Sequence, residues 1–330
     1  MFRYFYSAWK PFVFRAFASL LILFSTHESI AQQFMGRGVV ISEFAGANDI
    51  RDAKNFGANV VRWQMLGWEN DATGAGFLGN IYHLHTVILP ACQVHGIKVI
   101  IDLHYPPGGY TVPTNDPTNH SSWKHRFITM PNHWSNQEFD NSWLAISNIC
   151  KNQNEVIGYC LCSEPLSTMA EWRARALSTI QKIRANGDQK KILFEMPFGN
   201  PDYFKGFIPF KPGQAGQVCY GFHMYHPHRF THQGTGSYPN NSQLNIQALT
   251  HAMRHAIQWK STWPNREVHC SGFSANRFAS GSDLYVRDCI RIFERPNNKF
   301  SWTYHAYNEA DVWRITPSRE LLLRSWFELN

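Results

Sequence analysis

The chain has 330 residues and a formal net charge of +7 at pH 7. Its basic residues are scattered, with no run of five or more, which excludes the continuous basic surface that is typical of a nucleic-acid-binding protein. After the N-terminal region, no segment reaches the roughly 18 uninterrupted apolar residues that a membrane-spanning helix needs.

The N-terminus has the three-part layout of a secretory signal. Basic residues, the last of them Arg15, precede the apolar stretch 16–24, and the small residue Ala31 lies where a signal peptidase would cut. We therefore expect residues 1–31 to be a cleaved signal peptide and residues 32–330 to form one domain. The mature protein is expected to be secreted or periplasmic, with no membrane attachment after cleavage.

Short apolar runs alternate with helical patterns along the rest of the chain. The predicted strands lie at residues 38–44, 59–64, 98–104, 156–164, 191–196, 218–225, 267–273 and 300–304. The predicted helices lie at residues 81–94, 136–151, 170–185, 246–259, 284–293 and 319–327. This alternation indicates parallel strands joined by helices. Eight strands in roughly 300 residues predict an α/β fold of the (β/α)8 TIM-barrel type. A doubly wound open sheet is the alternative, but no glycine-rich phosphate turn follows an early strand.

In a TIM barrel the active site lies at the C-terminal ends of the strands. One such end carries Glu164, followed by Pro165 and preceded by an apolar run, which is how a barrel strand delivers an acid to a site. The end of the seventh predicted strand carries Gly272 where a partner carboxylate would be needed. The same rule selects the other residues that end predicted strands: Arg62, His104, Glu195, His223, Tyr225 and Trp302.

Several short motifs, taken together and in order, resemble glycoside hydrolase family 5. They are Val61-Arg62-Trp63, Asp102-Leu103-His104, Ser163-Glu164-Pro165, His223-Met224-Tyr225 and Gly272-Phe273-Ser274-Ala275. The resemblance extends from about residue 36 to residue 313. It implies a retaining glycosidase that cuts a β-linked oligo- or polysaccharide of the glucan or mannan type and uses no cofactor.

The resemblance also assigns roles to single residues. Glu164 corresponds to the general acid/base, and Arg62 would support the nucleophile through its charge. His104 and His223 would line the sugar subsite. Tyr225 would donate a hydrogen bond to the nucleophile. Retaining enzymes of this kind need a second carboxylate about 5 Å from the first, which attacks the sugar and forms a covalent intermediate.

At two positions the chain departs from the family pattern. The family has an asparagine that contacts the substrate where this chain has Ser163, and it has the nucleophilic glutamate where this chain has Gly272. Trp302 would form the sugar platform by the same resemblance. Glu195, at the end of the fifth predicted strand, is the one nearby carboxylate that could substitute for the nucleophile.

These departures leave three functional hypotheses. The first is a glycoside hydrolase whose retaining hydrolysis is impaired or lost. The second is a non-catalytic glycan-binding pseudoenzyme, and the third is an active hydrolase that uses Glu195. The sequence is equally compatible with natural loss of the nucleophile and with its deliberate removal, and it determines no oligomeric state.

Two clusters of potential ligands remain open to more than one interpretation. Side-chain alternation predicts that four of the seven cysteines face the barrel axis, namely Cys160, Cys162, Cys219 and Cys270. A metal site or disulfide is one interpretation, although the favoured one is that they fill the core as small apolar groups. No C-x2-C spacing is present, so we expect no metal site.

The loop after the sixth predicted strand carries a second cluster, composed of His226, His228, Arg229 and His232. It could bind an anionic sugar or a metal. Contacts with neutral sugar hydroxyls are the favoured interpretation.

Overall fold

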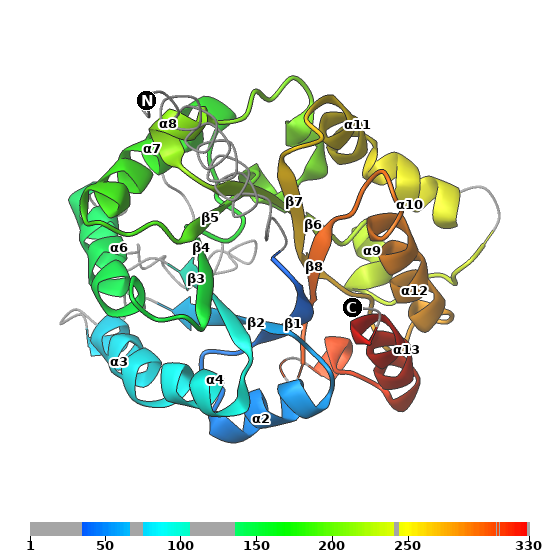
Figure 1. Ribbon diagram of the computed structural model, residues 1–330. Helices are drawn as coiled ribbons and strands as arrows, with labels where there is room; N and C mark the ends of the chain where they lie inside the picture. Colours follow the sequence, from blue (N-terminus) through cyan, green and yellow to red (C-terminus); the bar gives the residue numbers. More distant parts are fainter. Residues whose placement is uncertain are drawn as a thin grey trace, which may run out of the picture. The chain divides into compact units, whose positions relative to one another are not determined.

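Eight parallel strands close on themselves in a computed structural model of the protein, which describes residues 35–66, 75–105, 136–240, 244–307, 309 and 311–328. Each strand pairs with the next in sequence, and β8 pairs with β1, so the barrel has no open edge (Figure 1). The strands are β1 Arg37–Ile41, β2 Val60–Leu66, β3 Lys98–Tyr105, β4 Val156–Cys160, β5 Lys191–Glu195, β6 Val218–Met224, β7 Glu267–Phe273 and β8 Ser301–Tyr304. The prediction of a TIM barrel is confirmed.

Residues Met35–Asn330 belong to one compact unit. The expected signal peptide, residues 1–31, lies outside the described residues. None of the described helices is long and apolar enough to cross a membrane.

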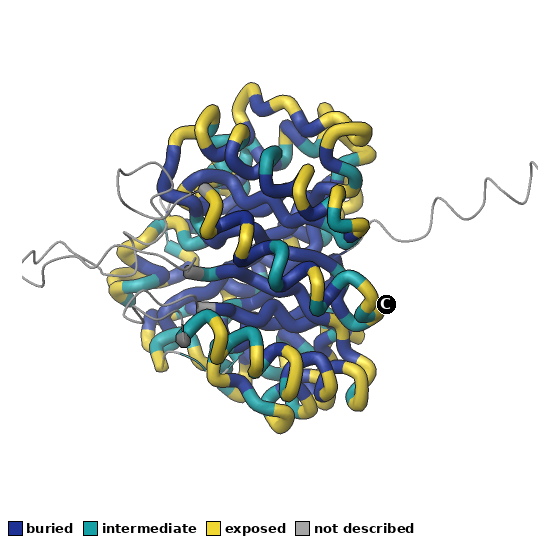
Figure 2. Tube along the Cα trace, turned by 90° about the vertical axis from the view of Figure 1, so that its left-hand side faces the viewer, coloured by how far each residue is buried: buried dark blue, intermediate teal, exposed yellow. Residues whose placement is uncertain are grey.

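The helices form a ring around the barrel (Figure 1). Those of at least seven residues are α2 Ala47–Asn55, α3 Ala75–His83, α4 Leu89–His95, α6 Asn136–Cys150, α7 Met169–Ala185, α10 Ile246–Ala252, α11 Arg254–Thr262, α12 Ser282–Phe293 and α13 Pro317–Phe327. Shorter helical turns are α8 Pro212–Ala215 and α9 His228–Thr231. Along the chain, exposed positions alternate with buried ones in the helices, whereas the strands are buried almost throughout (Figure 2).

Two predicted helices are interrupted. The pattern at residues 81–94 becomes α3, a π-helical turn at Leu84–Ile88, and α4. Pro90 has no backbone N–H to donate to the carbonyl one turn earlier, and such a position favours a local change of helical register. The pattern at residues 246–259 divides at Met253 into α10 and α11.

The predicted fourth strand is too long at its C-terminal end. It ends at Cys160, and Glu164 lies in the loop that follows. Glu164 has a positive φ of 44°, a left-handed conformation that is incompatible with a strand and uncommon for a residue other than glycine. The acid is therefore presented from a strained turn beyond the end of the strand.

The interior of the barrel has two regions. An apolar layer inside the barrel contains Met35, Val60, Ile100, Cys160, Leu193 and Cys219. Further along the same strands, alternation brings charged groups to the axis, among them Arg62, Asp102 and Glu195, all buried. The apolar layer closes one end of the barrel, and the charged layer forms the floor of its C-terminal mouth.

The prediction that four cysteines face the axis is half wrong. Cys160 and Cys219 belong to the interior apolar layer, whereas Cys162 and Cys270 belong to the core between barrel and helices. Cys162 follows the end of β4, where alternation stops. The pairing of β7 shifts register between Cys270 and Phe273, and this bulge breaks the alternation. All seven cysteines are free and buried.

Candidate active site

Arg62 of β2 organises the charged layer. Its guanidinium lies 3.0 Å from Asp102 Oδ2 and 3.0 Å from Glu195 Oε1, and it donates to the carbonyl of Ser271 at 3.0 Å. Burial would lower the pKa of Arg62, but the charges of Asp102 and Glu195 raise it above its ordinary value. The guanidinium is therefore a permanent positive charge beneath the mouth of the barrel.

Glu195, at the C-terminal end of β5, is fully buried and is held by several donors, among them the Cys160 thiol at 3.5 Å. Its Oε1 accepts from Arg62, its Oε2 accepts from the backbone N–H of Glu164 at 2.9 Å, and His223 Nε2 lies 3.3 Å from Oε1. Burial acts to raise the pKa of Glu195, but His223 and Arg62 outweigh it and hold the pKa well below its usual range. A carboxylate enclosed in this way stabilises the floor and has no route to a substrate.

Glu164 lies directly above that floor. The hydrogen bond from its backbone N–H to Glu195 fixes the left-handed turn, and its Oε1 lies 2.6 Å from His223 Nδ1. Strained non-glycine residues concentrate at functional sites, where the surrounding structure imposes the conformation. The turn directs the carboxyl group of Glu164, which is 29% exposed, into the cavity at the mouth of the barrel.

His223 of β6 connects the two glutamates. Its Nδ1 faces Glu164 and its Nε2 faces Glu195, so both ring nitrogens meet carboxylate oxygens. Burial would lower the pKa of His223, but the two carboxylates raise it to about 9. The imidazole is consequently an imidazolium at neutral pH. One N–H donates to the carboxylate of Glu195, and the other donates to Oε1 of Glu164, an oxygen that accepts a hydrogen bond whether or not the carboxyl group carries a proton.

A second histidine is oriented on the opposite side of the mouth. His104 Nδ1 lies 2.9 Å from Asp102 Oδ2, and the same oxygen pairs with Arg62. Asp102 thus fixes both the guanidinium and the imidazole. His104 is partly exposed and lines the cavity.

Gly272 lies on β7 at the bulge that follows Cys270. Its backbone φ is outside the left-handed region, so an L-residue could adopt the same conformation. A Cβ atom at this position would point at the site, 2.9 Å from the Tyr225 hydroxyl and 3.4 Å from the His223 ring. A side chain at position 272 would therefore be directed at the cavity, and the Tyr225 hydroxyl would lie beside it.

The cavity at the C-terminal ends of the strands has a volume of about 1330 Å³. Five of the residues selected from the sequence line it, namely Arg62, His104, Glu164, His223 and Tyr225. It also contains residues that were not selected, including Gln64, Phe198, His305, Glu309 and Trp313. This volume is larger than the roughly 300–1,000 Å³ that is common for small-ligand pockets.

Two predicted substrate contacts are wrong. Trp302 is fully buried in the core between the barrel and the helices. Its ring stacks on that of Phe327 with centroids 5.4 Å apart, and its indole N–H donates to Glu294 Oε1 at 2.8 Å. It lies one residue after the start of β8, at the end remote from the mouth. Ser163 is also fully buried, and its hydroxyl accepts from Arg62 at 3.1 Å, so it supports the floor and does not reach the cavity.

Phe198 is an exposed aromatic surface at the cavity rim that the sequence prediction missed. It is 47% exposed and stacks on Tyr203 with ring centroids 6.2 Å apart. Its φ of 57° is left-handed, and its N–H donates to the Pro165 carbonyl at 3.1 Å. The sequence signal was Pro197-Phe198-Gly199 directly after the fifth strand, although nothing in it indicated the strained turn.

His305 and Trp313 form the wall on the β8 side. Their rings lie 5.1 Å apart, and Trp313 also packs against Tyr225 at 6.2 Å. Burial lowers the pKa of His305 well below its ordinary value, with His104 and Arg62 adding to the effect. His305 is therefore neutral. It comes directly after β8, which makes it the strand-end residue that Trp302 was expected to be.

The histidine loop after β6 forms another part of the rim. His228 and His232 stack with ring centroids 3.9 Å apart, and His232 Nδ1 lies 2.9 Å from the Thr231 hydroxyl. Burial lowers the pKa of His232 to about 4, with His228 adding to the effect. His232 is therefore neutral at pH 7, which favours contacts with sugar hydroxyls over anion binding. Within the described residues, no group of three or more potential ligands is placed to hold a metal ion.

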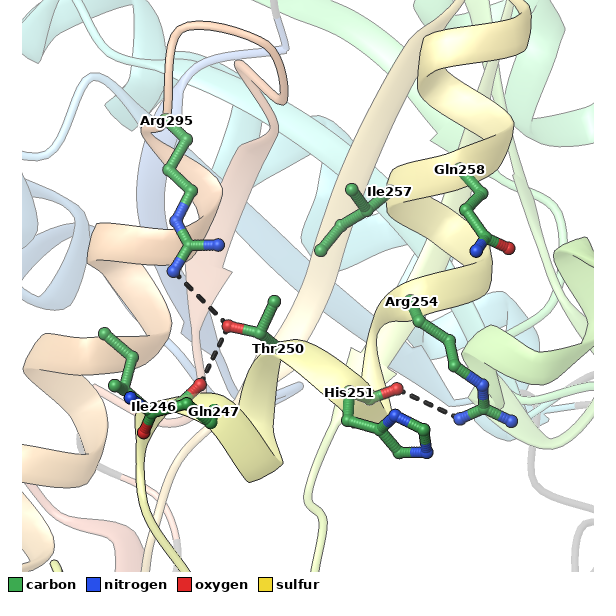
Figure 3. A pocket seen from close by; sticks show the side chains of 8 residues that line it. All are labelled: Ile246, Gln247, Thr250, His251, Arg254, Ile257, Gln258 and Arg295. Carbon is green, nitrogen blue, oxygen red and sulfur yellow. Dashed lines mark hydrogen bonds between the residues drawn. The ribbon is translucent and has the colours of Figure 1, made fainter.

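A second hollow of about 520 Å³ continues from the rim across α10 and α11 (Figure 3). It shares Gln247, His251 and Arg254 with the main cavity. Arg254 donates to the His251 carbonyl, and Arg295 donates to the Thr250 hydroxyl. The hollow lies away from the strand ends and carries no acid, so it extends the surface without adding reactive groups.

The family model for cellulase, glycosyl hydrolase family 5, matches residues 24–311. The chain therefore belongs to glycoside hydrolase family 5. A search of curated protein sequences finds no significant match.

Solved structures show the same architecture. The endoglucanase Cel5A of Pseudomonas stutzeri is 16% identical, with a TM-score of 0.66 over 88% of this chain and 93% of that one. Cellulose synthase subunit Z of Clostridioides difficile is 16% identical, with a TM-score of 0.66 over 88% of this chain and 99% of that one. XacCel5A in complex with cellopentaose is 15% identical, with a TM-score of 0.64 over 89% of this chain and 100% of that one. At these identities the likeness establishes the shared fold.

Proposed function

We propose that the protein binds a β-linked glucan chain in the cavity and retains Glu164 as a positioned proton donor, while ordinary double-displacement hydrolysis is lost or greatly slowed. The single observation that carries this proposal is the contrast between the oriented carboxyl of Glu164 and the absence of a side chain at Gly272. The cellulase family and the cellopentaose complex of XacCel5A support a glucan as the substrate.

The chemistry of a retaining glycosidase requires two separate acts. One carboxylic acid protonates the leaving oxygen, and a carboxylate attacks the anomeric carbon from the opposite face. Glu164 is placed for the first act by His223 and by its own strained turn. Glu195 cannot perform the second, because it is fully buried and enclosed by hydrogen-bond donors. Losing a covalent catalyst commonly costs several powers of ten in rate.

Small anions test this proposal directly. Azide or formate added with cellopentaose should increase product release by about 100-fold or more, since the anion attacks in place of the missing carboxylate while Glu164 protonates the leaving sugar. The matched variant Glu164→Gln should lose that increase, because general acid catalysis is worth about 10²–10⁴-fold. Anion-dependent turnover that persists in Glu164→Gln would refute the assigned role.

A non-catalytic glycan-binding protein is the second candidate. The position of the Tyr225 hydroxyl favours this candidate. The hydroxyl lies 2.9 Å from where a Cβ of residue 272 would be, so it leaves less room for an anion beside Gly272. Isothermal titration with cellopentaose together with the anion assay separates the two candidates. Binding without turnover under any anion supports the second, and absence of both would refute glucan as the ligand.

We also propose that the protein is exported to the periplasm or the exterior of the cell. The basic, apolar and small-residue order of residues 1–31 supports this. Mass spectrometry of the mature N-terminus tests it, with a protein beginning at about Gln32 as the expected result.

A further inference from the structure

Glu309 is a carboxyl group in the cavity that the retaining mechanism does not use. It lines the same cavity as Glu164, and its side chain is 30% exposed. Its Oε2 atom is buried and has no hydrogen-bond partner within the described structure. The nearest basic nitrogen, His305 Nε2, is 3.8 Å away, too far for a hydrogen bond. A buried acceptor without a donor is costly unless water or a ligand satisfies it.

The barrel places Glu309 across the mouth from Glu164. Glu164 follows β4 and Glu309 follows β8, and in the closed order from β1 to β8 these two strands are diametrically opposed. Gly272 lies on β7, the strand next to β8. Glu309 is therefore on the side of the cavity from which the missing nucleophile would have acted.

The surroundings of Glu309 tune it for proton transfer at neutral pH. Burial raises its pKa to about 7, the charges of Glu43 and Asp102 add to this, and Arg62 opposes it. His305, the other titratable group in contact with it, is neutral because its own pKa is well below the usual value. A general base is most effective when its pKa lies near the working pH.

We propose that Glu309 is a general base that activates a water molecule for single-displacement hydrolysis, with inversion at the anomeric carbon. Glu309 accepts a proton from the water, the water oxygen forms a bond to the anomeric carbon, and the glycosidic C–O bond breaks as Glu164 donates its proton to the leaving oxygen. The net reaction consumes one water molecule, and proton exchange with solvent then restores both carboxyl groups. The inference rests on the proposed glucan function.

This arrangement agrees with what separates the two classes of glycosidase. Inverting enzymes place a water molecule between the sugar and the base, so their two carboxyl groups are about 6.5–9.5 Å apart, against about 5–5.5 Å in retaining enzymes. Position 272 carries no carboxylate, and Glu309 follows β8, the strand next to β7. The Tyr225 hydroxyl, which faces position 272, remains protonated because burial raises its pKa well above the usual range, so it can donate a hydrogen bond there.

Stereochemistry and mutation test the inference together. Cellopentaose hydrolysis without added anions is followed by proton NMR, which identifies the first anomer released. We expect the α-anomer first, a kcat that rises with pH through about 7, and a loss of about 100-fold or more in kcat for Glu309→Gln with the KM and thermal stability preserved. Glu309→Asp, which keeps the charge, should lose less than Glu309→Gln.

Glu43→Gln is the matched control. Glu43 is half-buried after β1 and raises the pKa of Glu309, but it is not among the cavity-lining residues. Above pH 8 this variant should have the same kcat as the unmodified protein. The rising limb of its profile of kcat against pH should lie at lower pH. A limb that stays in place would overturn the assignment of that limb to Glu309.

Three outcomes would overturn the proposal. They are a β-anomer as first product, unchanged turnover in Glu309→Gln, and complete dependence of turnover on azide or formate. The last of these leaves the proposed glucan function intact, because binding and anion-assisted cleavage would still be seen. Failure to bind cellopentaose would instead refute the proposed function itself.

Discussion

The end of β4 and the end of β7 face the same cavity but are defined to very different degrees. After β4, Glu164 is fixed through its backbone by Glu195 and through its carboxyl group by His223. At the end of β7, Gly272 presents only backbone, and the Tyr225 hydroxyl approaches it. One strand end thus presents a carboxyl group held by several contacts, while the other presents no side chain.

The comparison shows that a position without a side chain can still be surrounded by fixed polar groups. Tyr225 and His223 lie within 3.4 Å of where a Cβ at position 272 would be, and Arg62 donates to the carbonyl of the preceding residue, Ser271. Arg62 and His223 also stabilise Glu195 in the floor, so their removal would leave a buried charge unpaired. These contacts hold Arg62 and His223 in place without any side chain at position 272.

Restoring the missing carboxylate should have the largest effect. Gly272→Glu is expected to raise unassisted cellopentaose hydrolysis by about 10³-fold or more and to release the β-anomer first, because covalent catalysis returns. The Tyr225 ring must shift, since a Cβ would lie 2.9 Å from its hydroxyl. Gly272→Gln, of the same shape without the charge, is the control and should show no gain. A gain in both variants would contradict a nucleophilic role for position 272.

Removing the negative charge of Glu195, which lies beneath Glu164, should affect the stability of the fold more than the rate of hydrolysis. Glu195→Gln leaves Arg62 and His223 buried with less compensation, so we expect a loss of about 3–5 kcal/mol in the free energy of unfolding. Urea denaturation measures it. Glu320→Gln breaks an exposed pair with Arg324 and should cost less than about 1 kcal/mol. Similar losses in the two variants would show that the floor is not the stabilising network described above.

The imidazolium that orients Glu164 should make stability fall with rising pH. The pKa of His223 is raised to about 9 from an ordinary value of 6.5, so its contribution is complete below pH 6.5 and is lost as the pH rises through 9. The expected loss is about 3 kcal/mol. Urea denaturation of the protein and of its His223→Gln variant at pH 6 and pH 9.5 isolates the contribution of His223 to the free energy of unfolding. An equal pH-dependent decrease in both proteins would assign it to other groups.

The smallest effect is expected at the rim on the Glu164 side. Phe198→Ala should weaken cellopentaose binding by about tenfold, because a stacked ring contributes about 1 kcal/mol or slightly more. Isothermal titration measures the affinity. Phe278→Ala, which removes an exposed aromatic ring that is not among the cavity-lining residues, should leave it unchanged. Equal weakening by both variants would exclude a specific platform at Phe198.

Local patterns in the sequence were enough to predict the barrel. Eight apolar runs separated by helical patterns produce closed parallel pairing, since each strand buries both faces and each helix covers its neighbours. The same patterns placed Arg62, His104, Glu164, His223 and Tyr225 around one cavity, because the ends of parallel strands meet at one mouth. Those predictions depended on order along the chain, which the sequence specifies directly.

Tertiary structure determined which way some side chains point, where the alternation of side chains along a strand did not predict it. The bulge in β7 turned Cys270 outward while Gly272 stayed directed at the cavity. The short β8 directed Trp302 into the outer core, where it packs on Phe327. Bulges and strand ends are set by pairing with neighbouring strands, so no single segment reveals them.

The sequence by itself determined the fold and the positions of Glu164 and Gly272 near strand ends, because each depends on residue type and order. The three-dimensional structure alone showed that Glu195 is buried beneath the cavity and that Glu309, which lies outside every predicted strand, lines the cavity. The physical reason is that burial, charge pairing and distance across a barrel mouth arise only when remote segments are folded against one another.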